Sequence, residues 1–181
     1  MPSDSAKILL TGLPGCGKTS AVMRIVERLD REKVAGFYTE EIRKENKRKG
    51  FRWARLDGAT GTLAHVGIRG SAKVGKYGVN VASFERQVVP VLDVEQSDAE
   101  LFVIDEIGKM ECFSEKLVAA VRRLFASEKS VLATVAQKGS GLIQEVKDYP
   151  GIRLFKLTSE NRDETIEEIL GILSSLQGSS S

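Results

Sequence analysis

Apolar residues recur along the chain with two different periods, and the alternation of the two predicts an α/β protein. Short unbroken apolar runs are typical of strands buried on both faces, whereas apolar residues three and four apart are typical of helices that cover a sheet. The runs lie at residues 7–11, 101–104, 130–136 and 152–157, and the helical spacings lie at 18–29, 84–95, 117–125 and 166–176. Helices between buried strands favour a mostly parallel sheet with right-handed crossovers and helices on both faces.

A different pattern follows the first helix. Residues 34–43 begin apolar and end polar, and residues 51–56 alternate between apolar and polar positions, which predicts an antiparallel hairpin at one edge of the sheet. Residues 62–68 are expected to add a third antiparallel segment. The glycines between residues 58 and 78 indicate short strands and loops.

Three side chains are expected to set helix boundaries. Ser83 and Ser114 are N-cap candidates, because a hydroxyl accepts a hydrogen bond from the free N–H groups of a first helical turn. Pro90 is expected to kink or split the helix that follows Ser83.

The string GLPGCGKT at residues 12–19 matches a phosphate-binding P-loop and lies between a strand and a helix, as that motif requires. Backbone N–H groups of such a loop converge at a helix N-terminus, where the helix dipole adds about half a positive charge. Lys18 is expected to contact the β- and γ-phosphates, and the Thr19 hydroxyl to bind a phosphate-bound Mg²⁺. The alternative is a chance match in a glycine-rich chain. The predicted nucleotide-binding residues of the loop are Gly12, Leu13, Pro14, Gly15, Cys16, Gly17, Lys18 and Thr19.

An acidic pair ends the apolar run at residues 101–104. Asp105 is expected to bind Mg²⁺ together with Thr19, and Glu106 to orient or deprotonate a water that attacks the γ-phosphate. Both carboxylates would also contact the nucleotide site, and Lys18 would join Glu106 as a catalytic residue. The alternative is a pair of solvated carboxylates at a strand end.

Other polar residues at strand ends have two interpretations, either as part of the site or as exposed side chains. Lys109 is either a phosphate contact or a loop lysine in water, and Glu40 and Glu41 are either site carboxylates or charges of an edge hairpin. Gln137 and Lys138 would lie near the γ-phosphate only if the strand before them neighbours the P-loop strand.

Bulk composition limits the protein class. At 181 residues the chain is expected to form one domain over residues 1–177 with a disordered tail at 178–181. With 27 Lys and Arg against 25 Asp and Glu, the net charge of +2 makes nucleic-acid binding an unfavoured function. Two cysteines without metal spacing and no long apolar window favour a reduced, cytoplasmic protein without a membrane span, and we expect a monomer. One histidine, His65, leaves too few for a histidine-based metal site.

Several strings together resemble one family in their order and spacing, from Lys7 to the terminal helix. They are GLPGCGKT, GFYTEEIR, KRKGF, VGKYGVNVASFE, VIDEIGKME and TSENRD. The chain resembles the P-loop nucleoside-triphosphatase family that includes cancer-related nucleoside-triphosphatase. That resemblance implies a RecA-like α/β sheet on the scale of nine strands, with the catalytic glutamate at Glu106. It implies that Asn161 and Arg162, the NR of TSENRD, bind nucleotide as well.

The resemblance also implies slow Mg²⁺-dependent hydrolysis of ATP, GTP and other nucleoside triphosphates, with little base selectivity. The residues leave two other functions open. One is a kinase that transfers the γ-phosphoryl group to a nucleotide or small hydroxyl compound, with Glu40 or Glu41 near the acceptor. The other is a nucleotide-gated RNA-binding module that uses the basic run at residues 43–52.

Overall fold

The computed structural model describes residues 5–177, so the expected tail at 178–181 lies outside the described residues. The elements are β1 Lys7–Thr11, α1 Lys18–Val26, η1 Arg31–Lys33, β2 Val34–Lys44, β3 Lys47–Arg55, β4 Thr60–His65, β5 Lys73–Val74, β6 Tyr77–Val79, α2 Val81–Gln87, η2 Val89–Leu92, β7 Leu101–Ile107, η3 Glu111–Phe113, α3 Glu115–Ala126, β8 Ser130–Val135, α4 Leu142–Lys147, β9 Arg153–Lys156 and α5 Arg162–Gln177. Here η denotes a short 3-10 helix.

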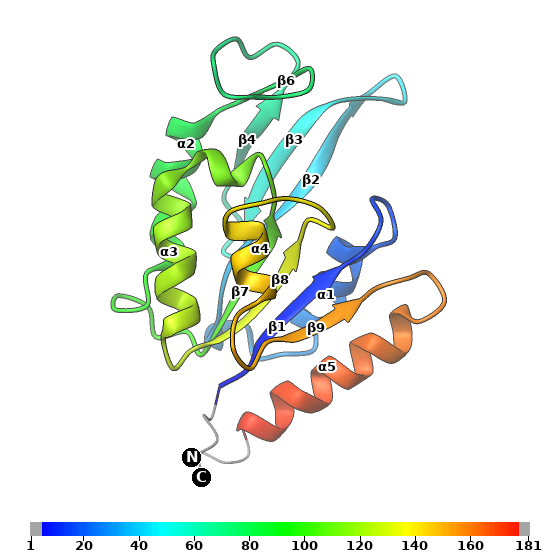
Figure 1. The fold of residues 1–181 in the computed structure, drawn as a ribbon, viewed down its shortest axis with the longest axis vertical. Coiled ribbons are helices and arrows are strands. Elements are labelled where there is room, and N and C mark those ends of the chain that lie inside the picture. Colours follow the sequence, from blue (N-terminus) through cyan, green and yellow to red (C-terminus); the bar gives the residue numbers. More distant parts are fainter. Residues whose placement is uncertain (1–4, 178–181) are drawn as a thin grey trace.

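All strands belong to one nine-stranded sheet of order β5-β6-β4-β3-β2-β7-β8-β1-β9 (Figure 1). The five neighbouring strands β2, β7, β8, β1 and β9 pair in parallel. Beside β2, the strands β3, β4, β6 and β5 extend the sheet with antiparallel pairings. The predicted α/β class and the antiparallel edge are therefore confirmed. The P-loop strand β1 lies inside the parallel part, between β8 and β9.

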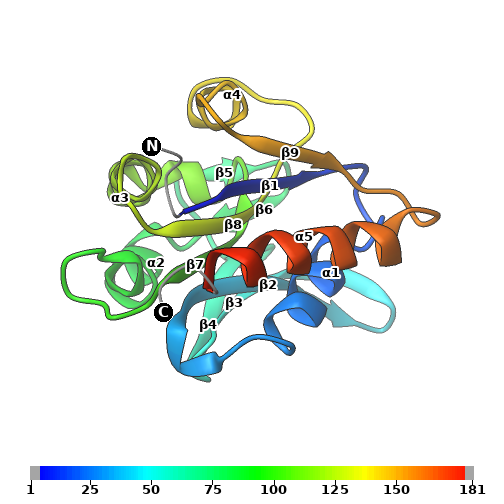
Figure 2. The ribbon, with the colours of Figure 1, turned by 90° about the horizontal axis from the view of Figure 1, so that it is seen from below.

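Successive residues of β1 face opposite layers of the molecule, as strand geometry requires. Leu9 packs with the core that includes α3 and α4, whereas Ile8 and Leu10 pack with the core of α1 and α5, and all three side chains are fully buried. Figure 2 shows α1 and α5 on one face of the sheet and α2, α3 and α4 on the other. Helices thus cover both faces, as predicted.

The basic run forms the tip of the β2–β3 hairpin. Glu45 and Asn46 make the turn with φ of 51° and 59°, and Lys44 pairs with Lys47 across it. Two successive left-handed residues suit the right-handed twist of a hairpin. The strand after the turn begins at Lys47 and not at residue 51 as predicted, because the ladder continues to the turn despite the charged side chains.

The ends of α1 and β7 also differ from their predictions, and the segment expected at residues 62–68 is β4, Thr60–His65. Helix α1 ends at Val26 and not at Leu29, because the N–H groups of Arg28 and Leu29 donate three residues back and tighten the last turn. Strand β7 continues through the acidic pair to Ile107, which is fully buried and pairs with Val135 after a register shift. Burial of Ile107 therefore extends the strand beyond the apolar run.

Of the two N-cap predictions, one is confirmed and one was wrong. Ser114 caps α3 by accepting a hydrogen bond from the Leu117 N–H at 3.0 Å, which confirms that prediction. The prediction for Ser83 was wrong, because Asn80 caps α2 and accepts from the Ser83 N–H at 3.2 Å. Pro90 splits the segment as predicted, since α2 gives way to η2.

Within residues 5–177, no helix combines the length and apolar character needed to cross a membrane.

Candidate active site

The P-loop leaves β1 at the carboxyl edge of the parallel strands and enters α1 at Lys18 (Figure 1). Two glycines are required there for different reasons. A Cβ at Gly12 would lie 2.6 Å from the Leu157 carbonyl oxygen, so this position has no room for a side chain. Gly17, the residue before α1, has φ of 95°, a conformation that glycine adopts without strain. The loop therefore follows the backbone course that a phosphate-binding turn needs.

Lys18 and Thr19 begin α1 and direct their side chains to different parts of the site. The Lys18 ammonium donates to the Gly12 carbonyl at 3.1 Å, so it lies over the loop itself. The Thr19 hydroxyl donates to Asp105 Oδ2 at 2.6 Å and so joins the P-loop helix to β7. Residues 86 positions apart in the sequence thus meet at one point.

Asp105 is the central buried carboxylate, with 2% of its surface exposed. Thr134 of β8 donates to its Oδ1 at 2.5 Å, and Thr19 donates to its Oδ2. Burial raises the pKa of Asp105, while the hydroxyls of Thr134 and Thr19 and the charge of Lys18 oppose that shift. The hydroxyl of Thr19 and the carboxylate of Asp105 are the hard oxygen donors that suit Mg²⁺, which usually keeps substrate phosphates among its ligands.

Glu106 lies at the register shift of β7, where the strand leaves its regular pairing with β8. Burial raises the pKa of Glu106, the negative charge of Asp105 raises it further, and Lys18 lowers it. A carboxylate in this setting is more basic than one in water, which suits a group that must accept a proton.

The two residues of the NR motif lie after β9, near the end of the P-loop. Arg162 begins α5, and its Nη1 lies 2.5 Å from the position that a Cβ on Gly17 would take, so its guanidinium covers the end of the P-loop. Asn161 is held within the chain, because its Oδ1 accepts from the Thr158 N–H at 2.8 Å and its Nδ2 donates to the Lys156 carbonyl at 2.9 Å. Asn161 therefore shapes the loop that presents Arg162.

The hairpin carboxylates have partners on the hairpin itself. Arg52 donates to Glu40 at 2.6 Å, and both Arg43 and Arg48 form ion pairs with Glu41. These contacts favour the edge-hairpin interpretation of Glu40 and Glu41 over a site role.

Three other residues had two interpretations in the sequence, and all three are exposed. Lys109 is exposed on the loop after β7, and Gln137 and Lys138 are exposed after β8. Strand β8 does neighbour β1, which meets the condition set for Gln137 and Lys138, and their role stays a prediction.

Two residues near the acidic pair were missed by the sequence analysis as site residues. Thr134 appears there only as part of a buried strand, because the sequence does not reveal that β8 lies beside β7 with its hydroxyl toward Asp105. Glu111 is 5% exposed, although it follows a polar loop that suggests solvent exposure. The available signal for Thr134 was its place inside an apolar run, since a buried polar side chain points to a local hydrogen bond.

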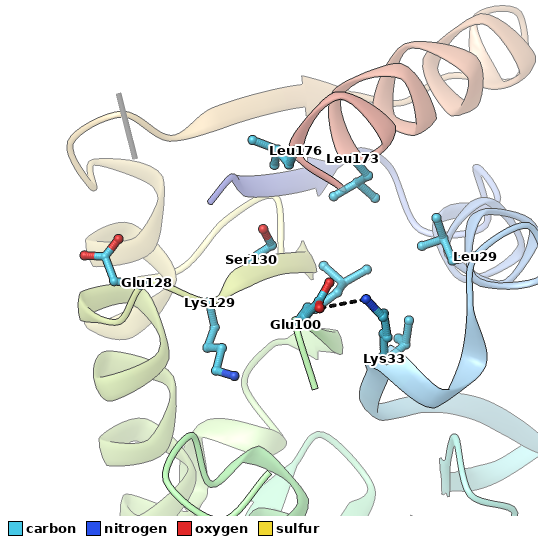
Figure 3. Close-up of a pocket in the computed structure, with 10 residues that line it drawn as sticks. Leu29, Lys33, Glu100, Glu128, Lys129, Ser130, Leu173 and Leu176 are labelled. Atoms are coloured by element: carbon cyan, nitrogen blue, oxygen red, sulfur yellow. Dashed lines mark hydrogen bonds and ion pairs between the residues drawn. The ribbon is translucent and has the colours of Figure 1, made fainter. Parts of the chain in front are cut away.

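Two cavities lie away from the P-loop. One, of 340 Å³, opens at the amino ends of the central strands, where Lys33 and Glu100 form an ion pair of 2.9 Å (Figure 3). It is at the opposite edge from the P-loop, so it is not the nucleotide site. The other, of 480 Å³, lies at the carboxyl edge and is lined by Lys73, Lys109 and Phe113 among others.

The sequence model of the family described as NTPase matches residues 7–170, which is most of the chain. The chain belongs to this NTPase family. Among family members, it is 40% identical over 167 residues to nucleoside-triphosphatase THEP1 of Thermotoga petrophila, covering 92% of each chain. It is 36% identical over 178 residues to the human cancer-related nucleoside-triphosphatase, covering 90% of this chain and 94% of the human one. The predicted family resemblance is thereby confirmed.

Solved structures of NTPase family members share the fold. The crystal structure of THEP1 from Aquifex aeolicus aligns with a TM-score of 0.83 at 38% identity, covering 92% of this chain and 98% of that one. The solution structure of the human cancer-related nucleoside triphosphatase aligns with a TM-score of 0.79 at 35% identity, covering 94% and 98%. The similarity extends over nearly the whole α/β sheet.

Proposed function

We propose that this protein is a Mg²⁺-dependent nucleoside triphosphatase that releases the γ-phosphate of ATP, GTP and other nucleoside triphosphates to water. Membership of the NTPase family and the names of its relatives support hydrolysis of nucleoside triphosphates. Those names specify no single base, which supports the broad base tolerance in the proposal.

The observation that carries the proposal is the 2.6 Å contact between the Thr19 hydroxyl and Asp105, with Glu106 as the next residue. The P-loop would bind the phosphates through its backbone N–H groups and Lys18, and Arg162 would add a second cation beside the loop. Thr19 and Asp105 would hold Mg²⁺, which supplies positive charge to the phosphate oxygens when bound. Glu106 would orient the attacking water and accept its proton.

The first prediction separates binding from chemistry. Lys18→Ala should weaken binding of a non-hydrolysable ATP analogue with Mg²⁺ by about tenfold or more, because a charged hydrogen bond to phosphate is lost. Glu106→Gln should keep that affinity but lower kcat by about a hundredfold or more, because the amide cannot accept the proton. Calorimetric titration and a phosphate-release assay measure the two effects.

The matched control is Lys116→Ala, which removes an exposed lysine of α3, on the opposite face of the sheet from α1, and should change neither property. Phosphate release is measured with ATP, GTP, CTP and UTP, with Mg²⁺ and with a chelator. Wild-type turnover in Glu106→Gln would remove Glu106 from the mechanism. Transfer of labelled γ-phosphate to an added acceptor at rates well above its release would support a kinase instead.

The monomeric state, the cytoplasmic location and the single-domain division at residue 177 stay predictions.

A further inference from the structure

A second buried carboxyl group lies beside Glu106. Glu111 begins η3, five residues further along the chain, and its residue is 5% exposed. No ion pair of Glu111 occurs within residues 5–177, although glutamate is rarely buried without a cationic partner. Its carboxylate interacts instead with the backbone amides of Gly108 and of Glu111 itself.

Gly108 brings the two carboxyl groups together. A Cβ on Gly108 would lie 2.7 Å from Glu106 Oε1 and 2.9 Å from Glu111 Oε2, so the two side chains converge on the space above this glycine. Gly108 has no positive φ, so glycine is needed there for space and not for backbone conformation. The turn between β7 and η3 therefore places Glu111 against Glu106.

The surroundings of the two carboxyl groups differ in charge. Lys18 acts on Glu106 and favours its ionised form, whereas the charged groups that act on Glu111 are the carboxylates of Glu106 and Asp105. The titratable neighbour on its own element, Cys112, has a pKa raised to about 11 by burial and by Glu111, so its thiol stays neutral. Burial, followed by the charge of Glu106, raises the pKa of Glu111 to about 8. Glu111 therefore carries a proton at neutral pH and has an O–H group to donate.

We propose that Glu111 is a positioning residue for hydrolysis: its buried carboxyl group, across Gly108 from Glu106, donates a hydrogen bond that fixes the orientation of the Glu106 carboxylate. Fixing one side chain by the hydrogen bond of another keeps the base in the productive geometry. The inference rests on the proposed function, in which Glu106 prepares the attacking water.

The test compares two substitutions at one position. Glu111→Leu removes the donor and should lower kcat by about tenfold or more, while affinity for a non-hydrolysable ATP analogue with Mg²⁺ changes less than about twofold. Glu111→Gln keeps an N–H donor of similar shape and should recover most of that loss. Wild-type kcat should also fall as pH rises past about 8, where Glu111 loses its proton, and this fall should be absent in Glu111→Gln.

A second variant, a control variant and a folding measurement distinguish loss of positioning from loss of folding. Gly108→Ala adds a methyl group that displaces both carboxyl groups, and it should lower kcat without loss of nucleotide affinity. Glu128→Gln, an exposed carboxylate before β8 at the opposite edge of the sheet, should behave as wild type. Thermal melting of each variant establishes that it is folded.

Glu106→Gln measured in parallel separates the two proposals. If Glu106→Gln is inactive and folded Glu111→Leu turns over as wild type, only the positioning role fails. If Glu111→Gln is as slow as Glu111→Leu, donation of a hydrogen bond is not the function of Glu111. If Glu106→Gln retains wild-type turnover, the role of Glu106 in the proposed function fails first. If both roles hold, the double variant should be no slower than Glu106→Gln alone.

Discussion

At the scale of single residues, the site is a cluster of carboxyl groups that are largely shielded from water. Asp105, Glu106 and Glu111 lie close together, and burial is the largest cause of a raised pKa at each of them. Lys18 is the cation whose charge opposes the shift at Asp105 and Glu106. Burial, followed by repulsion from Glu106 and Asp105, raises the pKa of Glu111 enough that this carboxyl group holds its proton at neutral pH.

This buried acid should make stability depend on pH. The pKa of Glu111 is about 8 in the folded chain against an ordinary value of 4.5, so the folded state binds the extra proton between those pH values. The folded state therefore keeps the full contribution of Glu111 to the unfolding free energy below pH 4.5. That contribution falls as pH rises above 4.5 and is lost once pH passes 8. Relative to Glu111→Gln, wild-type protein should lose up to about 1.4 kcal/mol of unfolding free energy per pH unit across that window.

Urea unfolding at intervals across the same pH range measures this difference. Glu128→Gln, which removes an exposed carboxylate, should give a curve parallel to that of wild type. Parallel curves for wild type and Glu111→Gln would show that Glu111 titrates as an ordinary carboxyl group.

At the scale of elements, short polar contacts decide where helices begin and where strands end. Ser114 is 1% exposed, accepts from the Leu117 N–H and donates to Glu85 of α2 at 2.9 Å. It therefore starts α3 and also ties α3 to the preceding helix. Because η3 and the turn at Gly108 come directly before α3, this cap also holds the segment that carries Glu111.

Ser114→Ala should lower the unfolding free energy by about 1–2 kcal/mol, because both a cap and a buried hydrogen bond are lost. Chemical denaturation measures the change. The matched control is Ser71→Ala, an exposed loop serine, which should change stability by less than about 0.5 kcal/mol. A loss in Ser114→Ala no larger than in the control would mean that the α3 N-terminus is stabilised in another way.

At the scale of the whole molecule, the carboxyl ends of the parallel strands collect the chemistry, and the basic hairpin tip follows the carboxyl end of β2. The loops after β1 and β9 bring Lys18 and Arg162 to the end of the sheet where Asp105 lies in β7. On the hairpin, the guanidinium of Arg48 donates to Tyr77 at 3.0 Å and to Glu41 at 3.0 Å. Much of the positive charge of the hairpin is thus used in internal contacts.

We therefore expect no salt-sensitive RNA binding by this hairpin at physiological salt. Fluorescence anisotropy with a labelled single-stranded RNA should show no saturable binding, with or without a triphosphate analogue. The comparison variant, in which Lys47, Arg48 and Lys49 are all replaced by Gln, should give the same result. Binding by wild type that this triple substitution abolishes would restore the RNA-binding interpretation.

The sequence by itself determined the elements whose signals are local. GLPGCGKT places a glycine turn before a helix, and the apolar runs at residues 7–11 and 130–136 predict buried strands, because backbone conformation and burial there depend on neighbouring residues. The family resemblance, the α/β class and the antiparallel edge likewise followed from strings and periods that can be seen in one dimension.

Only the tertiary structure decided which side chains meet. Strand order sets Thr134 against Asp105, although the two residues are 29 positions apart. Burial of Ile107 carries β7 beyond its apolar run, and the turn at Gly108 then places Glu111 beside Glu106. Hydrogen bonding and desolvation act between neighbours in space, so the pKa values of the carboxyl groups, and with them their chemistry, depend on the fold and not on the acidic string alone.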